Sequence, residues 1–258
     1  MGMARIAIDL PLGAALEFVR RFQRLLILLL LSTFVCEPSF AQSRDTGEAA
    51  SPLVVLGRSP LRADSYDNIL DILLEDAAQS RHEEGVLSWD LFQPEDGTRD
   101  LFAVERYKDR ATFDRHLQAP YVKVFLDNID AAVREGEEQS AIFMKALLPT
   151  ASKPILSPQT TKNLISVLSV KPESMPMTME SLLAVARAAR HEEGNLVYDV
   201  FQELSAPHRL VVFQRWETSN AYAKHCQQTR QKQLDALLIR VLTQPHQEIW
   251  MGVRDIGH

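Results

Sequence analysis

The stretch RHEEGVLSWDLFQ at residues 81–93 decides the fold, because the chain contains it twice. The second copy, RHEEGNLVYDVFQ at residues 190–202, is identical at nine of thirteen positions and lies 109 residues further along. The same offset pairs Asp109 with Thr218 and His116 with His225 without a gap. Self-similarity sustained at one spacing indicates a repeated structural unit. The sequence therefore predicts two copies of one domain.

The segment before the repeats differs in kind from the rest of the 258 residues. Residues 1–41 carry Arg20, Arg21 and Arg24 directly ahead of an apolar run, and they end in Ser39-Phe40-Ala41, which has small residues where a signal peptidase reads the chain. The run is about eleven residues long, whereas a membrane-spanning helix needs ~20. We expect an export signal cleaved near Ala41, a periplasmic or secreted mature protein, and no stable membrane span. A retained anchor is the alternative. Residues 42–52 follow as a flexible leader.

Charge and cysteine content narrow the class of protein. Residues 1–41 hold four of the 28 Lys and Arg and three of the 34 Asp and Glu, so the remainder carries a net charge of −7. A nucleic-acid partner is not expected for such an acidic chain. Cys226 is the one cysteine left after cleavage, so no intramolecular disulfide is available. Stability must then come from packing.

Apolar spacing and turn residues predict the order βαββαβ in each repeat. In the first repeat we expect strands, helices and caps as follows: strand 53–56, helix 64–80 closed by Gly85, strands 86–93 and 100–107, a helix capped by Asp109 and interrupted at Pro120, helix 122–133 and strand 141–147. In the second repeat we expect strand 164–170, helix 175–190, strands 195–202 and 209–216, one helix from Thr218 or Ser219 to Leu242, and strand 248–253.

This order predicts an α+β fold with two ferredoxin-like domains, residues 53–148 and 163–254, joined by a linker at residues 149–162. Both helices of such a domain cover one face of its sheet. Residues 86–93 are apolar on both sides, which is typical of a sheet covered on both faces. We therefore expect the two bare sheet faces to pack together as an intramolecular dimeric α/β barrel. Two such chains could also associate as a homo-oligomer through their outer helices.

Three motifs carry a family resemblance. These are Glu-Glu-Gly-x-Leu-x-Trp/Tyr-x-x-x-Gln, Glu105-Arg106-Tyr107 and His116-Leu-Gln-Ala-Pro120. The chain resembles the antibiotic biosynthesis monooxygenases, which include the quinol monooxygenases, over most of both repeats. The resemblance implies a dimeric α+β barrel and oxygenation of quinols or polycyclic phenols by O2 without metal, flavin or other cofactor. The same fold also hosts haem-degrading enzymes and proteins without known activity.

The catalytic candidates are His116, Glu105 and His225. Deprotonating a phenol near neutral pH suits histidine, whose ordinary pKa is near 6.5. The alternative is a structural histidine bordering the buried stripe of a helix. Glu105 could orient the histidine or form a salt bridge with Arg106 or Arg215. The second repeat has Gln214 in place of this glutamate.

The substrate-binding candidates are Trp89, Tyr198, Trp216, Tyr121 and Arg230. The first three could form aromatic walls around a planar substrate, although large aromatic residues in strands are usually core. Tyr121 and Arg230 stand where the family commonly has a second histidine, and Arg230 could hold an anionic group.

No metal site is expected. Adjacent residues in the two His-Glu-Glu triplets diverge at a helix end and cannot close a coordination sphere. A basic helix terminus followed by a glycine cap explains these triplets without a ligand.

Together these features predict an exported, cofactor-independent monooxygenase that oxidises a quinol or a related electron-rich aromatic compound with O2. The alternatives are a non-catalytic binding protein that holds a small hydrophobic molecule in the same barrel cavity, and a haem-binding or haem-degrading protein that uses His116. The first repeat is expected to be the more active, because it retains Trp89, Glu105, His116 and Tyr121.

Overall fold

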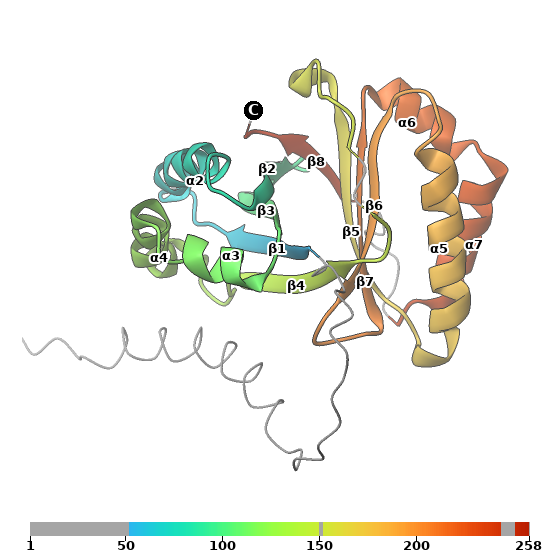
Figure 1. Ribbon diagram of the computed structural model, residues 1–258, viewed down its shortest axis with the longest axis horizontal. Coiled ribbons are helices and arrows are strands. Elements are labelled where there is room, and N and C mark those ends of the chain that lie inside the picture. The colour runs from blue at the N-terminus through green and yellow to red at the C-terminus, as the bar shows by residue number, and fades with distance from the viewer. Residues whose placement is uncertain (1–51, 150–151, 244–250, 258) are drawn as a thin grey trace, which may run out of the picture. The chain divides into compact units, whose positions relative to one another are not determined.

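The computed structural model describes residues 52–149, 152–243 and 251–257. The described residues form a closed eight-stranded barrel with α-helices packed outside it (Figure 1). The predicted signal at residues 1–41 and leader residues 42–51 lie outside the described residues, as do linker residues 150–151. None of the helices within the described ranges is long and apolar enough to cross a membrane.

The first repeat follows the predicted order. Its elements are β1 (Leu53–Pro60), α2 (Tyr66–Ser80), β2 (Val86–Pro94), β3 (Asp100–Tyr107), α3 (Arg110–His116), α4 (Pro120–Ala132) and β4 (Ser140–Ala146). The Asp109 side chain accepts a hydrogen bond from the backbone N–H of Thr112 at 2.8 Å, which confirms the predicted cap. The prediction that Gly85 closes α2 is wrong, because the helix already ends at the C-cap Arg81. Gly85, with a φ of +89°, instead belongs to the tight turn that leads into β2.

The second repeat has nearly the same bounds, shifted by 109 residues. Two single 3-10 turns, Pro158–Thr160 and Pro172–Ser174, accompany its regular elements. Those elements are β5 (Lys162–Ser169), α5 (Met175–Ala189), β6 (Asn195–Glu203), β7 (Arg209–Trp216), α6 (Ser219–Cys226), α7 (Thr229–Val241) and β8 (Met251–Asp255). Residues 248–250 of the predicted last strand lie outside the described residues.

The single helix predicted from residue 218 to Leu242 is wrong, because the chain breaks at Gln228 into α6 and α7. Gln228 has extended backbone angles (φ −63°, ψ 138°), nearly those of Ala119 in the first repeat (φ −63°, ψ 141°). Pro120 explains the break after Ala119, since proline disfavours helical geometry in the residue before it. Thr229 exerts no such constraint. Packing of the two short helices on the sheet therefore imposes the break in the second repeat.

The barrel closes because the last strand of each repeat pairs with the other repeat. β4 pairs with β1 and also with β6, and β8 pairs with β5 and also with β2. The full order is β1-β3-β2-β8-β5-β7-β6-β4, which leaves no free sheet edge. This confirms the predicted α+β fold of two ferredoxin-like units packed as an intramolecular barrel.

Charged as well as apolar side chains fill the barrel interior. Arg106 Nη2 lies 3.2 Å from Asp199 Oδ2 of the other repeat, and Arg215 Nη2 reciprocally lies 3.3 Å from Asp90 Oδ1. Both guanidinium groups lie over the ring of Phe213, 5.4 and 5.5 Å from its centroid. All four charged residues are buried. These four charged side chains lie in the barrel interior, where the sequence predicts the ligand cavity, and that cavity stays a prediction.

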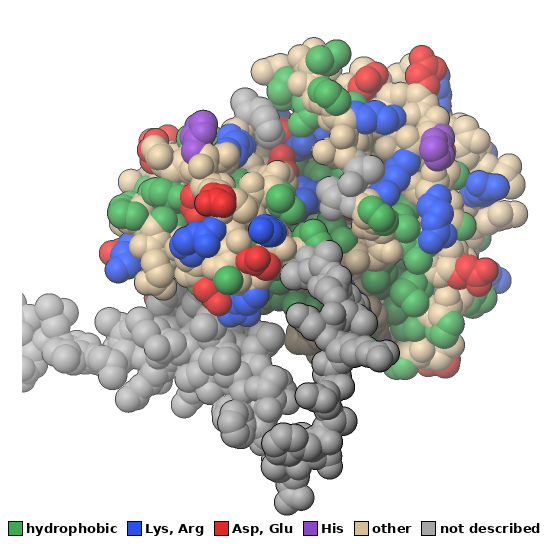
Figure 2. All heavy atoms as spheres, in the orientation of Figure 1, with side chains coloured by type: hydrophobic (Ala, Val, Ile, Leu, Met, Phe, Trp, Pro, Cys, Tyr) green, Lys and Arg blue, Asp and Glu red, His purple; other side chains and the backbone are tan. Residues whose placement is uncertain are grey.

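On the outside, acidic and basic side chains are interspersed over the face seen in Figure 2. The second apolar layer lies between the sheet and the helices, and it includes Trp89, Tyr107, Tyr198 and Trp216. The polar groups described next lie in this layer.

Candidate functional site

A buried histidine–glutamate pair lies between sheet and helices in the first repeat. His116 is the last residue of α3, and its Nδ1 donates to Glu83 Oε1 at 2.8 Å. Glu83 also accepts a hydrogen bond from the Tyr121 hydroxyl. The turn after α2 brings Glu83 to α3, and a Cβ on Gly85 would meet Thr112 Oγ1 at 2.8 Å. The His-Glu-Glu-Gly motif thus places a carboxylate on the histidine.

The second repeat builds the same pair. His225 Nδ1 lies 3.0 and 3.2 Å from the two carboxylate oxygens of Glu192. Gly194 has a φ of +78°, and a Cβ there would lie 2.6 Å from the Cβ of Ala221. In both repeats the glutamate precedes its histidine by 33 residues.

Sequence reasoning missed Glu83 and Glu192, because it explained both His-Glu-Glu triplets by helix capping. A usable signal was present, since each glutamate and its histidine recur together at the offset of 109 residues. The sequence analysis considered Glu105 as the carboxylate that orients the histidine. The structure shows that the histidine is hydrogen-bonded to Glu83 instead. Glu105 accepts from the Tyr107 hydroxyl at 2.5 Å, and Arg106 and Arg215 point into the barrel instead.

The first repeat holds two further carboxyl groups with raised pKa values near His116. Burial raises the pKa of Glu105 to about 7, opposed by the charge of His116 and by the hydrogen bond from Tyr107. Burial also raises the pKa of Asp76, which accepts from Ser80 Oγ at 2.7 Å. Ionisable groups displaced in this way are typical of sites where protons are exchanged.

The two histidines differ at their second ring nitrogen. His225 Nε2 donates to Gln231 Oε1 at 3.0 Å, and Gln231 Nε2 donates in turn to Asp235 Oδ1 at 2.7 Å. Both ring nitrogens of His225 are therefore occupied by hydrogen bonds within the protein. Val122 stands in the position of Gln231 in the first repeat, and among the described residues no hydrogen bond reaches His116 Nε2.

Two of the predicted aromatic residues, Tyr198 and Trp216, lie against His225. Trp216 stacks on His225 with ring centroids 4.6 Å apart, and Tyr198 contacts the same ring edge-on at 5.7 Å. Trp89 Nε1 and the Tyr198 hydroxyl, at equivalent positions of the two repeats, are buried without a hydrogen-bond partner in the described parts of the chain. All three residues belong to the packed layer, so their role as ligand walls stays a prediction. Gln214 accepts from Trp216 Nε1 at 3.1 Å, and in the described part of the chain no hydrogen bond joins it to His225 or Glu192.

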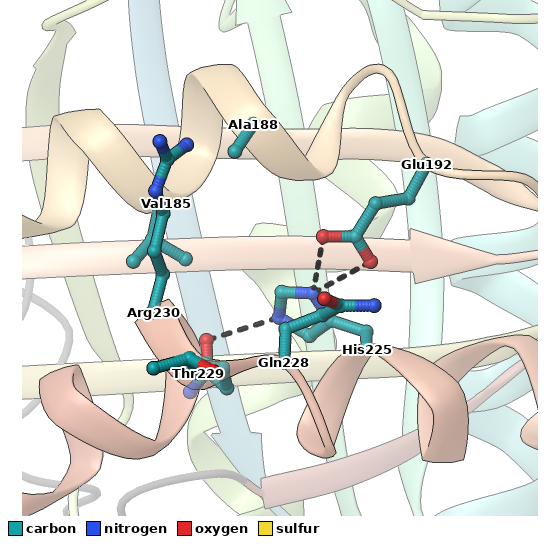
Figure 3. A pocket seen from close by; sticks show the side chains of 8 residues that line it. Val185, Ala188, Glu192, His225, Gln228, Thr229 and Arg230 are labelled. Atoms are coloured by element: carbon teal, nitrogen blue, oxygen red, sulfur yellow. Dashed lines mark hydrogen bonds and ion pairs between the residues drawn. The ribbon is translucent and has the colours of Figure 1, made fainter.

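A pocket of about 390 Å³ opens beside His225, on the helix side of the second sheet (Figure 3). Val185, Ala188 and Glu192 line one side, and His225 with residues 228–231 lines the other. In Figure 3 the Arg230 side chain lies at the opposite end of the pocket from Glu192. This pocket lies on the helix side of the sheet, outside the barrel interior where the sequence predicts the ligand cavity.

The fold and these pairs define a class of protein: an α+β barrel of two fused ferredoxin-like units, each with a buried histidine–glutamate pair under its helices. The sequence profile of the family "Antibiotic biosynthesis monooxygenase" matches residues 52–128 and 164–236, which include both histidines. The chain belongs to this family.

Solved structures share the whole two-repeat fold. A candidate monooxygenase from Fusobacterium nucleatum is 17% identical with a TM-score of 0.70, covering 80% of this chain and 93% of that one. A second candidate monooxygenase, from Lactobacillus acidophilus, is 12% identical with a TM-score of 0.66, covering 80% and 94%. At these identities the likeness shows the fold alone.

An uncharacterized protein of Synechocystis is 25% identical over 103 residues, which are 40% of this chain and 70% of that protein. Family membership supports a monooxygenase-type or small-molecule-binding function.

Proposed function

We propose that the protein is a cofactor-independent monooxygenase that oxidises a quinol or a related electron-rich phenol with O2, and that the first repeat carries out the chemistry. The observation that carries this proposal is the asymmetry between the histidines. His116 is held through Nδ1 by Glu83 and keeps Nε2 available, whereas His225 is hydrogen-bonded at both nitrogens. A general base needs one ring nitrogen held and the other free.

In this mechanism His116 Nε2 takes the phenolic proton, and Glu83 stabilises the imidazolium that forms. The electron-rich phenolate passes one electron to O2, and the resulting organic radical and superoxide combine to form a carbon–oxygen bond. Loss of water from the peroxide leaves a new carbonyl, so one oxygen atom enters the product and the other becomes water. Glu105, with a pKa of about 7, can supply a proton to the departing peroxide oxygen near neutral pH. The surrounding packed layer would shield the radical pair from water.

Tyr121 has a positioning role in this proposal, because its hydroxyl donates to Glu83. Trp89 offers a buried N–H that has no partner within the described ranges, and this N–H could donate to a substrate oxygen. The proposal includes export, which N-terminal sequencing of the mature protein would test. A first residue near Gln42 is expected.

Oxygen-electrode traces with a panel of hydroquinones test the activity. His116→Ala is expected to lower kcat/KM by about 10²-fold or more, as for a removed general base. The matched variant His225→Ala is expected to change it only a few-fold. Both variants need an unchanged melting temperature before the kinetics are interpreted. Equal losses would contradict the assignment to the first repeat, and full activity in both would remove histidine from the mechanism.

A non-catalytic binding protein is the second candidate, and the pocket beside His225 is the observation that favours it. No O2 uptake above the uncatalysed rate, together with retained ligand binding, would support it over the monooxygenase. A Soret band on addition of haem, lost in His116→Ala, would instead support haem binding.

A further inference from the structure

We propose that the second repeat contains an anion-selective binding site that takes the carboxylate group of a small aromatic or alicyclic acid. The site is the pocket of about 390 Å³ between α5 and the first turn of α7. This site lies in the second repeat, whereas the oxidation proposed above is assigned to the first repeat. The binding proposal does not depend on that oxidation.

The charges around this pocket favour a single negative charge. Glu192, the one carboxylate that lines it, is paired with His225. Arg230 is exposed and, among the described residues, makes no hydrogen bond or ion pair, so its guanidinium is available to a ligand. Figure 3 places it away from Glu192, at the end of the pocket near Val185. Guanidinium groups bind carboxylates through two parallel hydrogen bonds.

The start of α7 adds to this positive character. The helix runs from Thr229 to Val241, and Gln228 before it makes no side-chain cap. The first backbone N–H groups of a helix lack intrahelical partners, and the helix dipole favours an anion beside them. Thr229 also has a hydroxyl, and it lines the pocket with Arg230.

The first repeat is an internal control, because its helices have equivalent bounds and the same backbone break. Three of the differences at pocket positions bear directly on the binding of an anion. Asp76 of the first repeat is replaced by Val185, Pro120 by Thr229, and Tyr121 by Arg230. These exchanges respectively remove a carboxyl group, add an N–H donor and add a positive charge. All three favour an anion in the second repeat.

The remaining lining fits an apolar body attached to the carboxylate. Val185 and Ala188 present aliphatic surface from α5, and Ala188 replaces the larger, polar Gln79 of the first repeat. The volume is sufficient for a six-membered ring that bears a carboxylate. This combination selects a small cyclic monocarboxylate over a neutral or multiply charged ligand.

Isothermal titration of the mature protein with benzoate, and with benzamide as its neutral isostere, tests the site. Benzoate is expected to bind at least tenfold more tightly than benzamide. Arg230→Gln should weaken benzoate binding by tenfold or more. The matched control Arg240→Gln removes the same charge from the same helix about 15 Å away, at 1.5 Å per residue, and should change binding less than twofold.

Thr229→Pro installs the first-repeat residue, which a first helical position tolerates, and should weaken benzoate binding through the lost N–H. His116→Ala should leave it unchanged, which separates this site from the proposed chemistry. Absence of benzoate binding, equal affinity for benzoate and benzamide, or equal effects of the two arginine substitutions would each overturn the proposal.

Discussion

Replacing Glu105 by glutamine should remove a pH-dependent loss of stability from the protein. Burial raises the pKa of this carboxyl from 4.5 to about 7 in the folded chain. The second repeat shows that an amide fits the position, because Gln214 occupies it and accepts from Trp216 Nε1 as Glu105 accepts from Tyr107. The substitution therefore changes the charge and keeps the packing and the acceptor.

The sign and size follow from proton linkage. Between pH 4.5 and about 7 the folded chain keeps the Glu105 proton that the unfolded chain has released. The contribution of Glu105 is therefore fully present below pH 4.5 and is lost as the pH rises to about 7. At about 1.4 kcal/mol per pKa unit, the free energy of unfolding falls by roughly 3 kcal/mol over this range. At pH 8 the variant should unfold at a temperature roughly 6–12 °C above the unmodified protein.

Thermal and urea unfolding at half-unit steps from pH 4.5 to 8.5 would measure this difference. The two proteins should be nearly equally stable at pH 4.5 and should diverge steadily towards pH 7. Glu193→Gln is the control, because that side chain is 93% exposed and should show no such divergence. Parallel curves for Glu105→Gln and the unmodified protein would refute the argument, as would a less stable variant at pH 8.

Three further predictions concern the barrel and the turns. Asp199→Asn should cost about 3–5 kcal/mol in urea unfolding, because it removes the buried carboxylate that pairs with both Arg106 and the half-buried Arg190, whereas the exposed Asp64→Asn should cause no measurable change. A chain that ends at residue 150 should dimerise or aggregate in light scattering, because β2 and β4 lose their partner strands; a soluble monomer as stable as the whole protein would contradict the intramolecular barrel. Gly97→Ala should cost about 1–2 kcal/mol for its positive φ alone, and Gly85→Ala should cost more because of the added clash, so equal losses would argue against the tight turn that positions Glu83.

Local rules were sufficient to predict most elements of both repeats. Asp109 caps α3 because N-capping chemistry involves only a few neighbouring residues. Gly85 was placed correctly in a turn that needs a positive φ, but that turn lies before β2 and not at the end of α2. Alternating side chains along residues 86–93 predicted a sheet covered on both faces, and β2 has Trp89 under the helices and Phe92 in the barrel. The same local rules failed at Gln228, where no proline marks the break.

The site could be predicted only in part. Both histidines were identified from their residue type and their repetition. The partner of each histidine was not, because Glu83 and His116 are brought together by a helix, a hairpin and a turn. From the sequence, Glu105 and Glu83 are equally plausible hydrogen-bond partners for His116. Only the direction in which each side chain points in the folded protein decides between them.

The sequence by itself determined the duplication, the βαββαβ order, the ferredoxin-like class and the residue types available for chemistry, since these depend on spacing within short segments. Tertiary structure alone decided which carboxylate meets which histidine, and it placed the pocket outside the barrel. It also brought Arg106 to Asp199 across 93 residues and Arg215 to Asp90 across 125. Such contacts depend on how strands of different repeats pair and on which way each side chain points, and neither is determined by neighbours along the chain.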